Sequence, residues 1–210
     1  MSILSGLVGF AGSRSLPSVP ARTGLVTRVV RSVVAEGRPI TVGCAIGADA
    51  AVMTARMLLP FPESSSGPGM VVFSAFGPGG KGSWRGSAVP MVEQAASYRA
   101  PGGGTWAPVA VHWWAGGQEA IPLPTRLSMR TKVMCWTLRP WARSLIVVFF
   151  GYPGSRGSGL AAREAALAEV PVLAFPVGFN GEKLPTLMKG GRWIPAEGRG
   201  VWARAWKWAK

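Results

Sequence analysis

Acidic residues, histidine and cysteine are all scarce in this chain of 210 residues. It has 9 Asp and Glu residues, one histidine and two cysteines, Cys44 and Cys135, which lie far apart inside apolar segments. This small, scattered set argues against a disulfide framework and matches no metal-ligand spacing. The sequence therefore predicts a cytoplasmic protein without a metal or another cofactor. The single histidine, His112, has no partner that spacing identifies, so we interpret it as a packing residue and not as a catalytic base.

Long hydrophobic runs are also missing. No apolar run approaches the roughly 20 residues that cross a bilayer, and residues 1–10 lack the basic segment that opens a signal peptide. We therefore expect no membrane partner and no processing. The hydrophobic fraction of 48% argues against disorder, and the 29 glycines and 18 prolines indicate many tight turns. The length fits one domain with a short appendage.

Positive charge is abundant. The chain has 23 Lys and Arg residues, which gives a formal net charge of +14 at pH 7. Such a field attracts polyanions and favours a nucleic-acid or nucleotide ligand. Because anionic membranes and acidic proteins respond to the same field, the charge alone does not decide the partner.

Apolar segments of strand and helix character alternate along the chain. Short apolar runs predict strands at residues 5–11, 40–42, 71–73, 109–114, 144–150 and 172–175. Apolar residues at helical spacing predict helices at residues 22–36, 50–59, 88–99, 126–138 and 160–169. This alternation predicts the α/β class, with a Rossmann-like three-layer fold and a mainly parallel central sheet.

Three glycine-rich turns follow predicted strands. They are residues 12–14, residues 43–49 and residues 154–159. In a parallel sheet such turns meet at one edge, where free backbone N–H groups and helix dipoles bind anions. The candidate phosphate-binding residues in these turns are Gly12, Ser13, Arg14, Gly43, Ala45, Gly47, Asp49, Gly154, Ser155, Arg156, Gly157, Ser158 and Gly159.

Each of these assignments has a structural alternative. Glycine is what any tight turn needs, and Arg14 and Arg156 can equally be solvated surface charges. Asp49 stands where an acid caps a helix, so a capping or hydroxyl-orienting role competes with direct ligand contact.

The turns resemble the SLOG superfamily, and within it the Rossmann core of the DprA/Smf family of DNA-processing proteins. That family has a strand ending in Gly-Ser-Arg, as at residues 12–14. It then has a Gly-x-Ala-x-Gly-x-Asp-x-x-Ala turn, which residues 43–52 nearly reproduce as Gly-Cys-Ala-Ile-Gly-Ala-Asp-Ala-Ala-Val. Residues 130–132, Arg-Thr-Lys, stand where the family has Arg-Asn-Arg, and residues 157–160 match its Ser-Gly-Ser-Leu turn in part.

The resemblance covers roughly residues 3–60 and 120–178. It implies a site for a nucleotide or for the phosphates of single-stranded DNA, adds Arg130 and Lys132 to the candidate residues, and implies a fold that often dimerises. We therefore expect residues 1–178 to form the Rossmann-like domain. A homodimer is a further expectation that the sequence alone leaves open.

A sister branch, the LOG phosphoribohydrolases, supplies an enzyme alternative. Residues 129–134 are similar to its Arg-Lys segment, and residues 153–155 to its Pro-Gly-Gly loop. The branch places its catalytic acid where this chain has Leu160 and Ala161, so Glu164 is the nearest surrogate. In this alternative Arg130 and Glu164 take part in N-glycosidic hydrolysis of a nucleoside monophosphate. A nucleotide sensor without turnover is a third candidate.

Residues 179–210 form a basic, tryptophan-rich C-terminal extension. Trp202, Arg204, Trp206 and Lys207 represent its mixture of aromatic and cationic side chains. The tryptophans would stack on bases and the cations would pair with phosphates, so such a segment would bind single strands. The competing interpretation is a helix on which Trp202 and Trp206, four residues apart, pack against the domain, and a third places that helix on an anionic membrane. The leading prediction for the whole chain is binding of single-stranded nucleic acid without chemistry of its own.

Overall fold

The computed structural model describes residues 6–16, 20–60, 68–98 and 109–210. Its strands are β1 (Val8–Gly12), β2 (Ile40–Val42), β3 (Met70–Phe73), β4 (Val109–His112), β5 (Leu145–Phe150), β6 (Val172–Pro176), β7 (Arg192–Pro195) and β8 (Trp206–Ala209). Its α-helices are α1 (Pro20–Ala35), α2 (Ala48–Met57), α3 (Val89–Ser97), α4 (Leu123–Leu138) and α5 (Arg156–Leu167). Two short 3₁₀ helices are η1 (Pro78–Gly80) and η2 (Gly200–Arg204).

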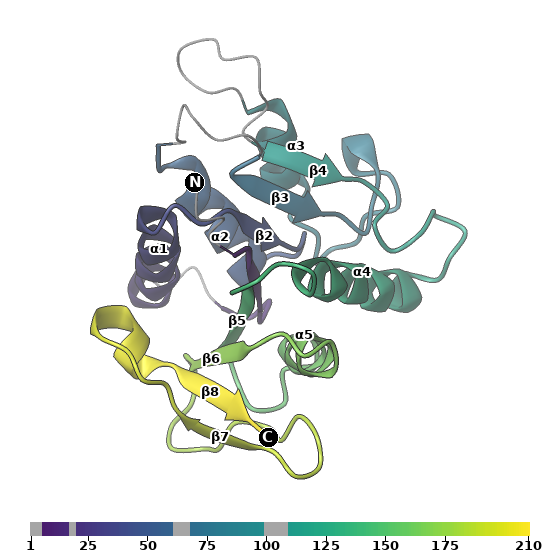
Figure 1. Cartoon of the computed structure of the whole chain (residues 1–210). Helices are drawn as coiled ribbons and strands as arrows, with labels where there is room; N and C mark the ends of the chain where they lie inside the picture. Colours follow the sequence, from purple (N-terminus) through teal and green to yellow (C-terminus); the bar gives the residue numbers. More distant parts are fainter. Residues whose placement is uncertain (1–5, 17–19, 61–67, 99–108) are drawn as a thin grey trace.

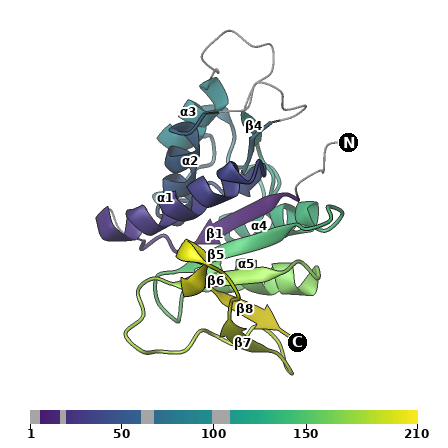
Figure 2. The ribbon, with the colours of Figure 1, turned by 60° about the vertical axis from the view of Figure 1, so that its left-hand side comes forward.

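The strands form one sheet in the order β4-β3-β2-β1-β5-β6-β8-β7. All pairs from β4 to β6 are parallel, whereas β8 is antiparallel to both β6 and β7. From β1 the chain crosses to β2 on one side, and from β5 it crosses to β6 on the other. The strand order therefore reverses between β1 and β5, which Figure 2 shows next to each other. In open α/β sheets this reversal marks the usual ligand site.

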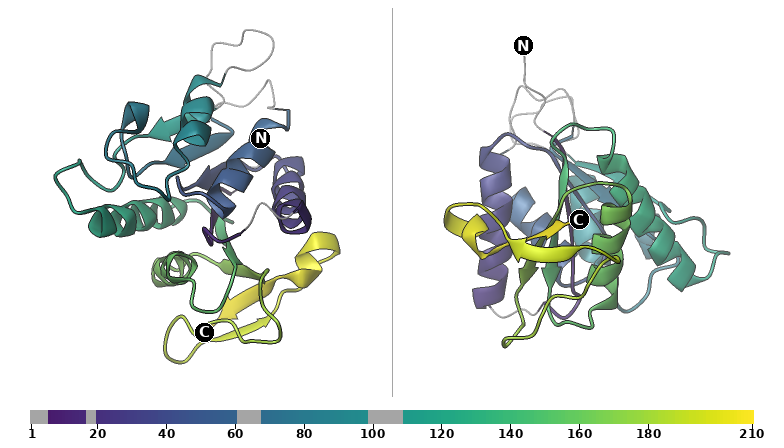
Figure 3. Two further views of the ribbon diagram at one scale, coloured as in Figure 1. Left: turned by 180° about the vertical axis from the view of Figure 1, so that it is seen from behind. Right: turned by 60° about the horizontal axis from the view of Figure 1, so that its bottom comes forward.

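Helices cover both faces of the sheet. One apolar cluster joins α1, α2 and α3 to one face, and a second joins α4 and α5 to the other. The right-hand view of Figure 3 shows α1 and α5 on opposite sides of the strands. β5 is the apolar run Leu-Ile-Val-Val-Phe-Phe, and residues 146–150 are fully buried because helices lie on both sides. This is the predicted three-layer α/β fold with a mainly parallel sheet.

The first turn of α5 departs from its predicted position. The sequence predicts a loop through residue 159, whereas the helix begins at Arg156 and includes Gly157, Ser158 and Gly159. Helix formation is possible here because the Ser155 and Ser158 hydroxyls bond to each other, 2.8 Å apart, and Ser158 donates to the Phe149 carbonyl at 3.2 Å. The side chain of Ser158 is thus used to anchor the helix to the end of β5.

The helical interpretation of the C-terminal tryptophans is wrong. Trp202 lies in η2, but Trp206 lies in β8, where it is opposite Ala174 of β6. Ala205 between them is extended and ends the helical turn. Figure 1 shows this segment as a hairpin of β7 and β8 that extends the sheet beyond β6. Among the described residues, none of the helices is both long and apolar enough to traverse a bilayer.

Candidate functional site

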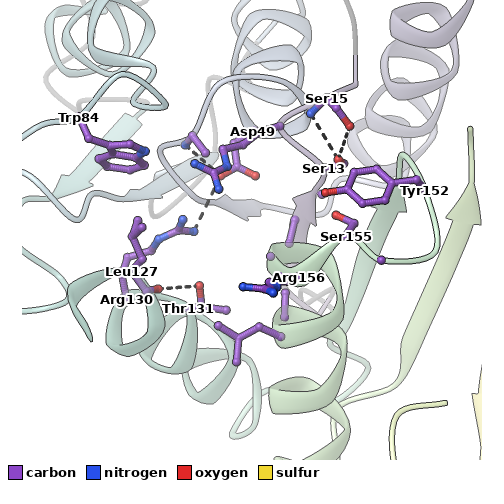
Figure 4. Close-up of a pocket in the computed structure, with 18 residues that line it drawn as sticks. Ser13, Ser15, Asp49, Trp84, Leu127, Arg130, Thr131, Tyr152, Ser155 and Arg156 are labelled. Atoms are coloured by element: carbon purple, nitrogen blue, oxygen red, sulfur yellow. Dashed lines mark hydrogen bonds and ion pairs between the residues drawn. The ribbon is translucent and has the colours of Figure 1, made fainter. Parts of the chain in front are cut away.

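A pocket of about 330 Å³ opens at the carboxyl ends of β1 and β5, where the strand order reverses. Figure 4 shows it between the turn after β1, the start of α5 and one side of α4. It is lined by ten of the predicted residues, namely Gly12, Ser13, Arg14, Ala45, Asp49, Arg130, Gly154, Ser155, Arg156 and Gly157. The three glycine turns and α4 therefore share one hollow.

Gly43 and Gly47 lie behind the pocket and shape it without lining it. A Cβ atom at Gly43 would overlap the guanidinium of Arg130 and the carboxylate of Asp49. At Gly47, with φ +83°, a Cβ would lie 2.5 Å from the carbonyl oxygen of Ser13. Glycine at these positions lets the β1 turn and the Arg130 side chain approach the start of α2 closely.

Arg130 and Asp49 form a buried pair at the base of the pocket. Arg130 is 6% exposed and Asp49 is 3% exposed. Arg130 Nη1 lies 3.8 Å from Asp49 Oδ2, which is longer than a hydrogen bond, while Asp49 Oδ2 accepts the Ala45 N–H at 3.1 Å. The buried Nε of Arg130 has no hydrogen-bond partner among the described residues. The guanidinium thus retains donor capacity at the base of an open pocket.

Burial dominates the electrostatics of this pair. Loss of water around Asp49 raises the pKa of its carboxyl above the ordinary value, while Arg130 and the Ala45 N–H act in the opposite direction. Asp49 does not cap α2, which has no side-chain cap hydrogen bond; it accepts the Ala45 N–H of the preceding turn and also lines the pocket.

The start of α5 offers several consecutive free backbone donors. The N–H groups of Arg156, Gly157 and Ser158 at the start of α5 have no hydrogen-bond partner within the described parts of the chain. In contrast, the Ser13 and Ser15 N–H groups bond to Phe149 O and Ser13 Oγ. At the start of α2, Ala48 N–H donates to the Ser13 carbonyl at 3.2 Å. With three such donors in a row, the positive end of the α5 dipole is therefore suited to hold an anion.

The remaining predicted residues lie outside the pocket lining. The exposed Lys132 Nζ is 3.9 Å from Glu164 Oε1, so these two side chains pair with each other. Gly159 faces open space. Glu164, the surrogate acid of the enzyme alternative, does not line the pocket. No group of three or more potential metal-ligating residues occurs in the portion of the chain that is described.

Several lining residues were not predicted. Trp84, Leu127, Thr131, Tyr152 and Ser15 also face the pocket. Ser15 and Ser13 bond through their hydroxyls, 2.8 Å apart, and half of Tyr152 is exposed, at 48%. A glycine-rich loop after β3 brings Trp84 to the pocket, and its position in the sequence gave a signal only for a loop.

The tail residues contribute to a different hollow. Trp202 and Lys207 line a second pocket of about 380 Å³, which shares no lining residue with the first. Trp202 Nε1 donates to Ser32 Oγ of α1 at 3.0 Å, and its ring packs 6.1 Å from Phe175. Arg204 is exposed, and Trp206 is 37% exposed. The hairpin therefore places none of these four side chains in the first pocket.

Comparison with known proteins gives a likeness of fold. No family model matches the sequence, and no curated protein sequence matches it. Among solved structures, DNA processing protein A from Helicobacter pylori, described for its single-stranded DNA binding mode, superposes with a TM-score of 0.55 at 13% identity. The match covers 82% of this chain and 66% of that chain. At this identity the likeness shows the fold, and it agrees with the DprA-like resemblance of the turns.

Proposed function

We propose that the protein binds single-stranded nucleic acid, with single-stranded DNA as the first candidate, through phosphates held in the pocket between β1, α4 and α5. The observation that carries the proposal is the guanidinium of Arg130, which lines an open hollow and has, among the described residues, no closer polar partner than the Asp49 carboxylate at 3.8 Å. A guanidinium in this position suits an anionic oxygen, because a buried unpaired donor is costly without a ligand.

The surroundings of Arg130 support the same ligand. The exposed Arg14 and Arg156 flank the pocket, Ser13 and Ser15 supply hydroxyls, and α5 supplies free N–H groups. Such donors match phosphate oxygens, and the net charge of +14 draws a polyanion towards them. The Helicobacter pylori protein of similar fold binds single-stranded DNA, which supports this ligand by analogy of fold.

The test is a titration of fluorescently labelled single-stranded DNA at several salt concentrations. We expect affinity to fall steeply with salt, with a slope of about −0.7 in logarithmic units for each phosphate contacted. Arg14→Gln combined with Arg156→Gln should flatten this slope by the equivalent of one to two phosphates, roughly 0.7 to 1.4.

Lys207→Gln is the matched control, since it removes an exposed charge that lines the second hollow instead. It should leave the slope nearly unchanged. Absence of binding at low salt, or equal effects of the two sets of variants, would overturn the proposal.

A further inference from the structure

Trp84 forms one wall of the pocket and has an unused donor. The side chain is half-buried, and its Nε1 is buried without a hydrogen-bond partner among the described residues. Figure 4 shows the indole on one side of the Arg130–Asp49 pair and Tyr152 on the other. Because the Nε1 atom is buried beside Gly86, the indole offers the pocket the surface of its ring and not its N–H.

The loop that carries Trp84 is held rigidly by Arg126. This buried guanidinium donates to the carbonyls of Ala75 at 2.8 Å, Gly82 at 3.0 Å and Ile121 at 3.0 Å. It also lies over the Trp114 ring, 5.4 Å from the centroid. One side chain thus joins two points of the loop on the N-terminal side of Trp84 to the segment before α4.

Local contacts fix the indole itself. The backbone N–H of Trp84 donates to Ser87 Oγ at 2.9 Å, and the indole ring packs edge-on against Phe76 with centroids 6.3 Å apart. A Cβ at Gly86 would lie 2.8 Å from Arg14 Nη1 and would overlap Trp84 Nε1. The indole edge and the Arg14 guanidinium therefore converge beside Gly86, at the side of the pocket away from α5.

The size of the pocket fits more than a phosphate. A volume of about 330 Å³ is within the range of pockets that hold small organic ligands. Its cationic and hydroxyl groups gather around Arg130, Arg156 and Ser13, whereas Trp84 and Tyr152 add aromatic surface on opposite sides. Phosphate donors next to an aromatic wall are what a nucleotide requires, since every base offers a flat face for stacking.

We propose that the pocket takes one whole nucleotide unit of the strand, with its phosphate at Arg130 and its base stacked against the ring of Trp84. This inference rests on the proposed function and names the part of the ligand that the phosphate donors leave unspecified. Trp84 is then the residue that makes the protein bind a strand with bases more tightly than a bare sugar-phosphate chain.

The experiment compares two labelled oligonucleotides of equal length, one a thymidine homopolymer and one wholly abasic. The protein should bind the thymidine strand about 5- to 100-fold more tightly than the abasic strand, which is the range for one stacked base. Trp84→Ala should remove most of this preference while leaving abasic binding nearly unchanged. Trp84→Phe retains a smaller aromatic ring for stacking and should show an intermediate preference.

Trp141→Ala is the matched control. Trp141 is 48% exposed and lies just before β5, at the opposite edge of the sheet from the pocket. This variant should keep the full preference for the thymidine strand. Thermal melts of all variants monitor folding, and if Trp84→Ala does not fold, the ratio of the two affinities in Trp84→Phe decides.

The outcomes separate the two proposals. Two results would overturn the role of Trp84 and leave phosphate binding intact. One is equal, salt-dependent binding of both strands by the unaltered protein. The other is an unchanged preference in Trp84→Phe and Trp84→Ala. Failure of the unaltered protein to bind either strand at low salt overturns the proposed function itself. A preference that Trp84 variants lose and Trp141→Ala keeps supports the inference.

Discussion

The two hollows that line the sheet edges have similar volumes, but the first has an excess of positive charge and the second is balanced. The first, about 330 Å³, is lined by Arg14, Arg130 and Arg156 against a single acid, Asp49. The second, about 380 Å³, has two cations, Arg38 and Lys207, against Glu36 and Glu197. The volumes therefore give no reason to prefer one hollow as the site for a polyanion, whereas the charge balance favours the first.

The arginines of the two hollows also differ in how many of their donors are already bonded within the protein. In the second hollow Arg38 donates to the carbonyls of Gly6 and Arg143 and lies 3.8 Å from Glu36, so its guanidinium is occupied. In the first, Arg130 reaches only Asp49, at 3.8 Å, and keeps its Nε unpaired within the described structure. A cation is available to a ligand when the fold leaves its donors unused, and the residue type alone does not reveal this.

Neutralising Arg130 should have the largest effect. Arg130→Gln leaves Asp49 buried without its partner, so we expect a loss of stability of about 3 kcal/mol. Affinity for single-stranded DNA should fall about 10- to 100-fold, the range for a lost charged hydrogen bond. Urea denaturation and fluorescence titration measure the two effects.

The double variant Asp49→Asn with Arg130→Gln distinguishes the two roles. Asparagine can still accept the Ala45 N–H and has no buried charge, so most of the stability should return. Binding should not return with it. Recovery of full affinity in the double variant would show that Arg130 acts only by neutralising Asp49.

Adding one methyl group beside Arg130 should have the next largest effect. Gly43→Ala places a Cβ where the Arg130 guanidinium and the Asp49 carboxylate lie, so the pair must shift. We expect affinity to fall about tenfold, equivalent to 1.4 kcal/mol, with a loss of stability of about 1–3 kcal/mol. Titration and denaturation again provide the readouts.

Gly157→Ala is the matched control for Gly43→Ala. Gly157 also lines the pocket, but a Cβ there would meet nothing within 4 Å. Its helical position favours alanine by up to about 1 kcal/mol. Equal weakening by the two substitutions would contradict the assignment of Gly43 as the residue that makes room for Arg130.

Lowering the pH should raise the affinity of the first hollow for single-stranded DNA, by less than the substitutions above change it. Burial raises the pKa of Asp49 in the folded state, so folding favours the protonated carboxyl. The stability that this carboxyl contributes is therefore fully present below its ordinary pKa of 3.8 and is lost as pH rises through the raised pKa. Ionised Asp49 also offsets the charge of Arg130, so affinity for DNA should fall over the same window, by less than about tenfold. Measurement of affinity against pH tests this.

Asp49→Asn removes this one titration and keeps every other titrating group. The pH dependence of DNA affinity should therefore be flatter in this variant than in the unaltered protein. If the two profiles coincide, Asp49 does not control the potential at Arg130.

The first hollow was largely predictable from the sequence because its parts follow buried strands. The apolar run of β5 places Ser155 and Arg156 at the carboxyl edge, and parallel pairing with β1 brings Ser13 to the same place. The unpaired state of Arg130 was not predictable, since it depends on a 3.8 Å gap between side chains from two helices. Trp84 was missed because its loop is positioned by Arg126, a contact between distant segments that leaves no local pattern.

The second hollow could not be predicted, because the spacing of the tryptophans near it fits both a helix and a strand. A four-residue interval between Trp202 and Trp206 suits one face of a helix, but four is also an even number and suits one face of a strand. Tertiary pairing decides between them, because β8 pairs with β6 and β7 through the backbone. The hydrophobic period of so short a segment is not enough to fix its structure.

The smallest effect on DNA binding should come from Trp202. Its Nε1 bond to Ser32 and its packing on Phe175 join η2 to α1 and the sheet, so Trp202→Ala should lower the free energy of unfolding by about 1–3 kcal/mol. Because Trp202 lines only the second hollow, affinity for single-stranded DNA should stay within about twofold at a temperature where the variant is folded. Trp206→Ala, at a 37% exposed position outside both hollows, should change stability less. A large loss of affinity in Trp202→Ala, with its stability intact, would mean that the strand follows the tail and that charge balance is the wrong criterion for choosing between the two hollows.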